Sequence, residues 1–273
     1  MPNIGFWIKN IGNWPNLLIR RQRVLNRQTP FTFLVNNAEA VEKGAANSDL
    51  GAIFFAHDGR FASKWAHYLP AYSEQFSPYR SGFPLPNGSR RPLKMLEIGT
   101  NHGGSLQMWR KYFGNKAAIY GIDIDPRCSR INDPDLKIRI GSQADRSFLE
   151  SVISEMGGVD IVLDDGSHHA KHQRASLEIL FPLLSEGGLY AAEDLHTAYW
   201  HDYGGGYKRH GSFLEVIKDL IDDMHISFHG KAHKLPGPIA GSVSRITIYN
   251  SMVFMKKKPR TREMYLKIGN PSF

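Results

Sequence analysis

From residue 93 onward, hydrophobic and polar positions alternate in blocks that each have the length of one strand or one helix. The apolar runs predict buried strands at 93–99, 118–125, 136–142, 159–167 and 187–194. Helical spacing between them predicts helices at 105–113, 146–156 and about 170–183. Alternating strands and helices are typical of an α/β fold with a mostly parallel, doubly wound sheet.

The two ends of the chain depart from this alternation. After a helix predicted at 212–224, the runs SRITIYN and SMVFMKK predict an antiparallel hairpin that closes one edge of the sheet. Before residue 93, we expect an N-terminal arm with a helix near 15–27 and a second helix at 61–76, bent or divided by Pro70. A loop or linker is expected at 81–92. These patterns divide the chain into a helical N-terminal region, 1–92, and a main domain, 93–273.

A glycine or a polar residue stands at the end of each of the five strands predicted between residues 93 and 194. In doubly wound folds, ligands bind outside the carboxyl ends of the strands. A single polar residue there could equally cap the following helix, but capping does not explain paired acids at two strand ends. The residues are Gly99, Asp123, Ser142, the pair Asp164–Asp165 and the pair Glu193–Asp194.

The first loop, LEIGTNHGGSLQMW at 96–109, has the glycines that let a backbone approach a ligand and turn into a helix. A nicotinamide enzyme would also have such a loop. Glu97 favours S-adenosylmethionine, because a carboxylate suits the cofactor's ammonium group and would repel a pyrophosphate. Asn101 stands where methyltransferases commonly have glycine. The expected cofactor-binding residues are Glu97, Gly99, Thr100, Gly103, Ser105, Asp123 (to both ribose hydroxyls), Ser142, Gln143 and Asp164.

The sequences DDGSHH at 164–169 and AAEDLH at 191–196 end the fourth and fifth strands. If these strands are neighbours, Asp165, Glu193 and Asp194 converge, and three close carboxylates repel one another unless they are protonated or bind a cation. Oxygen ligands suit Mg²⁺ or a similar divalent ion. The alternatives are helix caps, ion pairs with Lys171, Arg174 or Lys208, and a zinc site that uses the histidines.

His168 is the expected general base, because it lies three residues after Asp165 and imidazole titrates near neutral pH. His169 and His196 compete for this role. The stretch 196–210 is rich in glycine, tyrosine and histidine, which predicts a mobile loop whose aromatic faces suit a sugar or another ring.

The chain has a formal net charge of +8, much of it in two basic runs near the ends. Terminal clusters are weak support for a nucleic-acid groove and could also meet an anionic substrate, a membrane surface or another subunit. No apolar run has the ~20 residues of a membrane span, and no signal peptide is recognisable. A lone cysteine, Cys128, excludes an internal disulfide framework. We therefore expect a cytoplasmic protein.

Several of these segments together resemble the macrolide-sugar O-methyltransferases of the mycinamicin type. The wider group includes enzymes labelled cephalosporin hydroxylase and rhamnosyl O-methyltransferase. The resemblance covers roughly 93–258, and SKWAHYLPAY at 63–72 extends it. Its segments are LEIGTNHGGSLQMW, YGIDIDP, VDIVLDDGSHH, GGLYAAEDLH and SRITIYNSMVFMKK.

The resemblance implies a class I methyltransferase that uses Mg²⁺ and S-adenosylmethionine to methylate a hydroxyl of a sugar or glycosylated natural product. It assigns the metal ligands to Asp165, Glu193 and Asp194 and the general base to His168. It also implies a homo-oligomer, a dimer or tetramer. The alternatives are a catechol-type O-methyltransferase acting on an aromatic diol, a metal-dependent hydroxylase or hydrolase without S-adenosylmethionine, and a non-catalytic binding protein.

Overall fold

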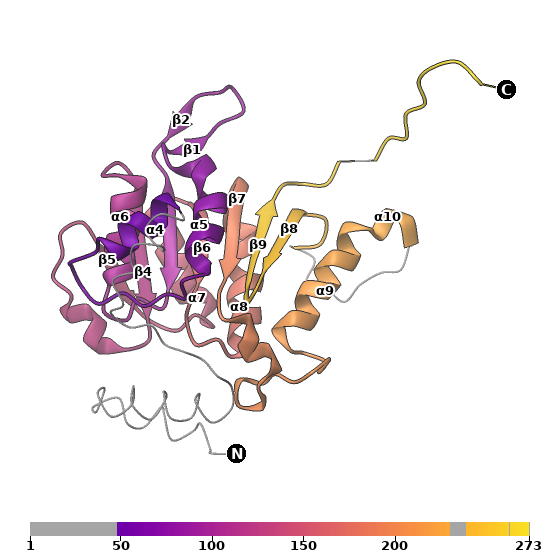
Figure 1. Ribbon diagram of the computed structural model, residues 1–273. Coiled ribbons are helices and arrows are strands. Elements are labelled where there is room, and N and C mark those ends of the chain that lie inside the picture. Colours follow the sequence, from indigo (N-terminus) through magenta and orange to yellow (C-terminus); the bar gives the residue numbers. More distant parts are fainter. Residues whose placement is uncertain (1–47, 230–238, 262, 273) are drawn as a thin grey trace.

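The structure of the protein is a computed structural model that describes residues 48–229, 239–261 and 263–272. Within these residues a seven-stranded sheet has the order β5-β4-β3-β6-β7-β9-β8 (Figure 1). Neighbouring strands from β5 to β7 are parallel, and β9 is antiparallel to both β7 and β8. The mostly parallel sheet and the C-terminal hairpin are therefore confirmed. The strands are β3 (Lys94–Ile98), β4 (Ala118–Asp123), β5 (Lys137–Ile140), β6 (Val159–Asp164), β7 (Leu184–Ala192), β8 (Val243–Tyr249) and β9 (Met252–Lys257).

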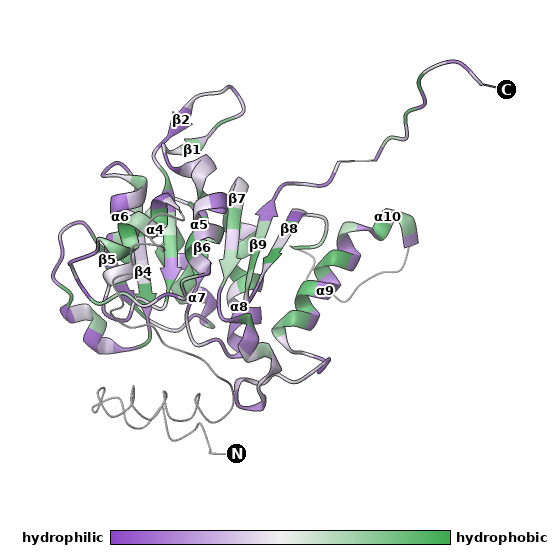
Figure 2. Cartoon of the chain, in the orientation of Figure 1, coloured by the Kyte–Doolittle hydropathy of each residue, from purple (hydrophilic) through white to green (hydrophobic). Residues whose placement is uncertain are grey.

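Helices cover both faces of the sheet. One face packs against α4, α5 and α6, and the other against α7, α8 and α9, with a hydrophobic cluster on each side. Figure 2 shows hydrophobic residues along the central strands and along α9. Among the described residues, no helix combines the length and the apolar character needed to cross a membrane. The helices are α4 (Asp49–Phe55), α5 (Tyr68–Phe76), α6 (Gly104–Phe113), α7 (Arg146–Met156), α8 (Ala170–Leu180), α9 (Phe213–Met224) and α10 (Ile226–His229).

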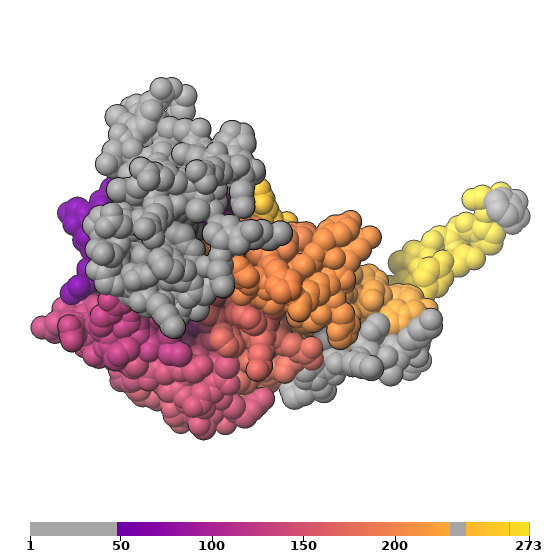
Figure 3. Space-filling model, turned by 90° about the horizontal axis from the view of Figure 1, so that it is seen from below, coloured from indigo at the N-terminus to yellow at the C-terminus, as the bar shows by residue number. Residues whose placement is uncertain are grey.

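Short 3₁₀ helices connect several of these elements. They are η1 (Ser77–Tyr79), η2 (Pro126–Arg130), η3 (Phe181–Leu183), η4 (Leu195–Tyr199) and η5 (His201–Tyr203). Residues 264–272 run away from the body as an extended tail, shown in yellow in Figures 1 and 3.

The sheet brings the polar strand ends together at one edge. β3 lies between β4 and β6, so the chain turns back at β3 and the strand order reverses there. In register, Ile98 lies opposite Asp164, and Asp164 lies opposite Ala192. The loops that begin at Gly99, Asp165 and Glu193 therefore leave the sheet side by side, as expected at the reversal point of a doubly wound fold.

The N-terminal region differs from its prediction in two places. The helix expected at 61–76 begins only at Tyr68. Pro70 lies in its first turn, where a backbone N–H has no acceptor within the helix, so the proline neither bends nor divides it. The expected loop at 81–92 contains a small hairpin of β1 (Phe83–Pro84) and β2 (Arg90–Arg91). The helix predicted at 15–27 lies outside the described residues.

Residues before the predicted boundary at 92 share one core with the sheet. The ring of Phe76 in α5 is fully buried, 5.5 Å from the ring of Trp109 in α6 and 5.9 Å from that of Phe254 in β9. Tyr72 packs against the same two rings. The division at residue 92 stays a prediction, but α5 is held by the packing of the main domain.

We therefore expect Phe76→Ala to lower the free energy of unfolding by about 3–5 kcal/mol, because it removes a buried ring between three elements. Urea denaturation followed by circular dichroism measures this change. Phe61→Ala is the matched control, since that side chain is 57% exposed, and its effect should stay within about 0.5 kcal/mol. A small effect of Phe76→Ala, or a separate early transition, would show that α5 does not belong to this core.

Candidate active site

The loop between β3 and α6 approaches the β6 loop so closely that residue 99 must be glycine. Gly99 has a φ of 93°, and a Cβ there would overlap the carbonyl oxygen of Asp165. Asn101 has a φ of 47°, which is the left-handed conformation that glycine favours and asparagine tolerates. The asparagine therefore preserves a glycine-like backbone. Gly103, with a φ of 82°, leads into α6.

Asp123 at the end of β4 fixes this loop from the side. Its Oδ2 accepts a hydrogen bond from the backbone N–H of Asn101 at 2.8 Å, and its Oδ1 accepts one from Asp125 at 2.9 Å. The Thr100 hydroxyl donates to the carbonyl of Ile122 at 3.3 Å. Asp123 thus lies beside the loop and remains half-buried, where contact with the cofactor ribose stays a prediction.

Glu97 lies beneath the loop and is fully buried. It accepts hydrogen bonds from the Ser105 hydroxyl at 2.7 Å and from Trp109 Nε1 at 3.2 Å. Burial raises the pKa of Glu97 above its usual value. Glu97 and Ser105 are thus tied to each other, which anchors the start of α6 to β3.

Asp164 has a similar buried position under the β6 loop. Its carboxylate accepts hydrogen bonds from Gln143 Nε2 at 3.1 Å, Tyr190 Oη at 2.9 Å and the Ser176 hydroxyl. Burial raises the pKa of Asp164. Gln143 also accepts the N–H of Ser167 through Oε1 at 2.8 Å, so it links the β5 and β6 loops.

Ser142 is half-exposed after β5, and its hydroxyl accepts the N–H of Ala144 at 3.2 Å. The residues expected to bind the cofactor therefore line one edge of the sheet, and their cofactor contacts remain predictions.

A lysine that the sequence analysis did not single out lies among the acids. The Lys64 side chain is only 1% exposed. Its Nζ pairs with Asp165 Oδ2 and with Glu193 Oε1, the latter at 2.7 Å, and lies 3.7 Å from Glu97 Oε1. Burial opposes the charged form, but Asp165 and Glu193 raise the pKa of Lys64 well above its usual value.

Three aromatic side chains near Lys64 also donate to the acids. Tyr68 Oη donates to Asp194 Oδ1 at 2.7 Å, and Trp65 Nε1 donates to the same oxygen at 3.2 Å. Tyr72 Oη donates to Glu193 Oε1. One short segment, 64–72, therefore contacts every acid that the sequence assigned to the metal.

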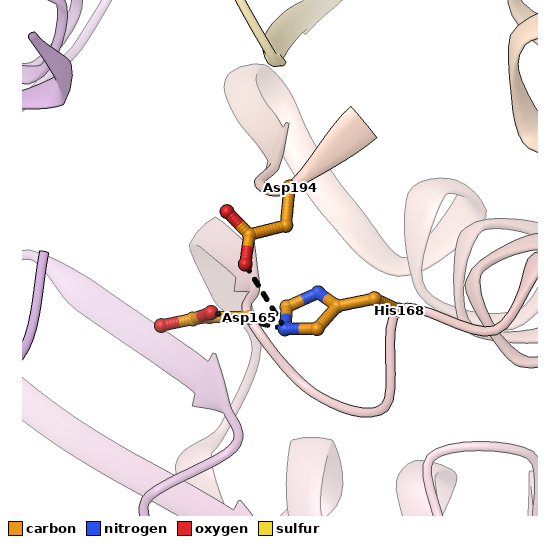
Figure 4. A group of neighbouring side chains, drawn as sticks. All are labelled: Asp165, His168 and Asp194. Atoms are coloured by element: carbon orange, nitrogen blue, oxygen red, sulfur yellow. Dashed lines mark ion pairs between the residues drawn. The ribbon is translucent and has the colours of Figure 1, made fainter. Parts of the chain in front are cut away.

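His168 faces two of these acids. Its Nε2 lies 3.6 Å from Asp165 Oδ1 and 3.5 Å from Asp194 Oδ2, and Figure 4 shows the ring edge turned toward both carboxylates. These three side chains offer donor atoms within 4.8 Å of one another, a spacing that can hold a metal ion. His168 and Asp194 both have a φ of 55°, a strained conformation that is concentrated at functional sites.

The predicted metal set is thus only partly assembled by these contacts. Asp165 and Asp194 converge with His168, whereas Glu193 is engaged by Lys64 and Tyr72. Oxygen donors fit a hard divalent cation, and the carboxylates here outnumber the single lysine. A lysine, a tryptophan and two tyrosines were missed, although their spacing in SKWAHYLPAY, with Tyr68 and Tyr72 one helical turn apart, could have revealed them.

The two competing histidines have other contacts. His169 caps α8, with its Nδ1 accepting the N–H of Lys171 at 3.3 Å. His196 Nδ1 lies 2.6 Å from the Ser251 hydroxyl. The His196 ring also joins an aromatic row, 6.0 Å from Trp65 and 4.9 Å from Trp200, whose side chain is 41% exposed. This row leads from the acids toward the protein surface.

Burial raises the pKa of Glu193 to about 7, against the opposing effect of Lys64. Burial also works to raise the pKa of Asp194, but His168 and Tyr68 lower it below its usual value. Glu193 and Asp194, which are adjacent in the sequence, therefore differ in how readily they ionise.

Comparison with known proteins agrees with this geometry. Residues 96–195 match the model of a methyltransferase domain. The chain is 33% identical over 220 residues to the 8-demethyl-8-(2-methoxy-alpha-L-rhamnosyl)-tetracenomycin-C 3'-O-methyltransferase of Streptomyces olivaceus. This match covers 77% of the chain and 54% of the relative. The chain is also 33% identical over 201 residues to the mycinamicin VI 2''-O-methyltransferase of Micromonospora griseorubida, and this match covers 70% of the chain and 48% of the relative.

A solved structure of the MycE methyltransferase from the mycinamycin biosynthetic pathway, in complex with Mg and SAH, has a TM-score of 0.64 and 30% identity to the chain. The match covers 83% of this chain and 57% of the solved one. The chain is a homologue of sugar O-methyltransferases. The family resemblance and the class I methyltransferase fold are therefore confirmed. The chain spans about half the length of the curated relatives it matches.

Lys64→Met should lower the free energy of unfolding by about 3–5 kcal/mol near pH 8, because it leaves buried carboxylates without their cation. The measurement is urea denaturation of the metal-free chain. Lys111→Met is the control, since Lys111 is an exposed lysine 3.4 Å from the exposed Asp58, and its change should stay within about 0.5 kcal/mol. Equal effects of the two substitutions would contradict the structural role of Lys64.

Glu193 should make the metal-free chain less stable as the pH rises from about 4.5 to 7. Its pKa is about 7 in the folded state and near 4.5 when unfolded, so the folded chain binds this proton more tightly and loses that advantage over this window. Glu193→Gln should remove this part of the pH dependence. Urea titrations at several pH values compare the two proteins, and identical slopes would refute the raised pKa.

Proposed function

We propose that this chain transfers a methyl group from S-adenosylmethionine to a hydroxyl of a sugar on a glycosylated natural product, with the help of Mg²⁺ or a similar divalent ion. The observation that carries the proposal is the convergence of Asp165, Asp194 and His168 beside the glycine loop, with Glu193 adjacent. The names of the relatives support it, since two of them describe O-methylation of a rhamnosyl tetracenomycin, and the MycE structure contains Mg and SAH.

The bound cofactor would supply an electrophilic methyl group on sulfur, and the bound cation would lower the pKa of the acceptor hydroxyl. Asp165, Glu193 and Asp194 would hold the cation. The loop from Gly99 to Gly103 and the Asp123 carboxylate would hold the cofactor at the carboxyl end of β3. Holding the acceptor hydroxyl and the cofactor in one fixed arrangement would supply a large part of the rate acceleration.

His168 takes the proton from the acceptor hydroxyl at Nε2, the nitrogen that faces the acids. The bound cofactor would then transfer its methyl group to that oxygen and be released as S-adenosylhomocysteine. An imidazole is also a possible metal ligand, but Mg²⁺ prefers oxygen, which favours the role of base.

A sugar acceptor is favoured over an aromatic diol, and over hydroxylase or hydrolase chemistry, because the relatives methylate sugars. The aromatic row of Trp65, His196 and Trp200 agrees with this choice, since ring faces pack well against sugars. The predicted homo-oligomer remains a prediction.

Two substitutions test the roles separately. Asp165→Asn should weaken binding of Mn²⁺, used as a spectroscopic substitute for Mg²⁺, and abolish metal-stimulated methyl transfer. His168→Gln should leave Mn²⁺ affinity unchanged and lower kcat by about 10²–10⁴-fold, the usual loss on removal of a general base. The assay follows S-adenosylhomocysteine release with mycinamicin VI and rhamnosylated tetracenomycin as acceptors.

Calorimetry with S-adenosylhomocysteine is the control, because both variants should bind it as the unchanged chain does. Full metal-stimulated activity of Asp165→Asn would refute the metal role. Weaker Mn²⁺ binding by His168→Gln would instead make the histidine a ligand, and failure of the unchanged chain to bind S-adenosylhomocysteine would refute methyl transfer.

A further inference from the structure

The three carboxylates assigned to the metal share one pattern of contacts. In each, one oxygen is engaged by the segment 64–72. Lys64 pairs with Oδ2 of Asp165, Lys64 and Tyr72 contact Oε1 of Glu193, and Trp65 and Tyr68 donate to Oδ1 of Asp194. No donor from this segment is found on the second oxygen of any of the three.

The second oxygens of Asp165 and Asp194 face the candidate site. Oδ1 of Asp165 and Oδ2 of Asp194 are the atoms that lie 3.6 and 3.5 Å from His168 Nε2. Lys64 and Tyr72 both contact Glu193 through Oε1. Asp165 and Asp194 therefore each have one oxygen bound by the segment 64–72 and one turned toward His168, where a ligand could bind, and Glu193 is held next to them through Oε1.

The donors come from a rigid part of the fold. Tyr68 and Tyr72 are one turn apart in α5 and are fully buried, and Lys64 and Trp65 immediately precede that helix. Packing of Tyr72 and Phe76 against Trp109 in α6 and Phe254 in β9 fixes α5 to the sheet that carries the acids. The donors are thus held in place before any ligand binds.

We infer that the segment 64–72 is an outer shell that orients the metal-binding carboxylates, with Tyr68 as its main positioning residue. This inference rests on the proposed function, because it takes Asp165, Glu193 and Asp194 as the ligands. Hydrogen bonds to ligating carboxylates fix their orientation, and removing such a bond typically weakens metal binding about 10–100-fold.

Tyr68 carries the sharpest form of the inference because its hydroxyl makes two contacts with one ligand. It donates to Asp194 Oδ1 and accepts the backbone N–H of the same residue at 3.2 Å. Asp194 is a non-glycine residue in the left-handed region, a conformation that costs free energy. The hydroxyl thus holds both the backbone and the side chain of Asp194.

The test compares Tyr68→Phe with Tyr79→Phe in the full chain. Both substitutions remove one hydroxyl from a buried tyrosine without a change in charge, and the Tyr79 hydroxyl donates to the carbonyl of Gly187 at 2.7 Å, in the first half of β7 and six residues before Glu193. Mn²⁺ affinity is measured by electron paramagnetic resonance, and circular dichroism checks the fold. We expect about 10-fold or greater weakening in Tyr68→Phe and no change in Tyr79→Phe.

Tyr72→Phe is the second variant, and it should weaken Mn²⁺ binding through Glu193 while its ring keeps its packing. Unchanged Mn²⁺ affinity in both Tyr68→Phe and Tyr72→Phe would overturn the inference and leave the proposed function standing. Equal weakening in Tyr79→Phe would also overturn it, because the effect would then be general. If the unchanged chain binds no Mn²⁺, the proposed metal role fails and this inference fails with it.

Discussion

The site depends on one electrostatic constraint, which is that several carboxylates are gathered in a largely buried space around a single lysine. Lys64 lies against Asp165, Glu193 and Glu97, and its ammonium reduces a repulsion that would otherwise drive these acids apart or keep them protonated. One ammonium does not neutralise them all. The remaining negative charge, directed toward His168, is what makes this edge of the sheet suited to a divalent cation.

The fold supplies this constraint through its strand order and its packing. β6 and β7 end side by side, so two acidic pairs from distant parts of the sequence become neighbours. Helix α5 and the residues just before it donate hydrogen bonds to one oxygen of each acid. Gly99 permits the close approach of the β3 and β6 loops. Strain at His168 and Asp194 is maintained because the surrounding contacts determine both positions.

Periodicity predicted the parallel sheet and the helices of the main domain closely, because each strand is a short apolar run and α7 coincides with its prediction at 146–156. It placed the start of α5 too early, since the apolar residues of 61–67 belong to a non-helical approach to the helix. The acids and His168 were found because helix capping needs only one polar residue at a strand end, so a pair of acids there indicates a ligand. Lys64 and its aromatic neighbours were not found, because a lysine beside aromatic residues is common in sequences. Its role depends on contacts with residues about 100 or more positions away in the chain.

The central claim is that three carboxylates hold one cation while the segment 64–72 holds each of them through one oxygen. The most direct measurement is anomalous diffraction from crystals of the chain grown with Mn²⁺ and S-adenosylhomocysteine. The account predicts one manganese peak bound by Asp165, Glu193 and Asp194, with Lys64 still paired to Asp165 and Glu193. A peak that has displaced Lys64, or a manganese bound elsewhere in the molecule, would contradict it.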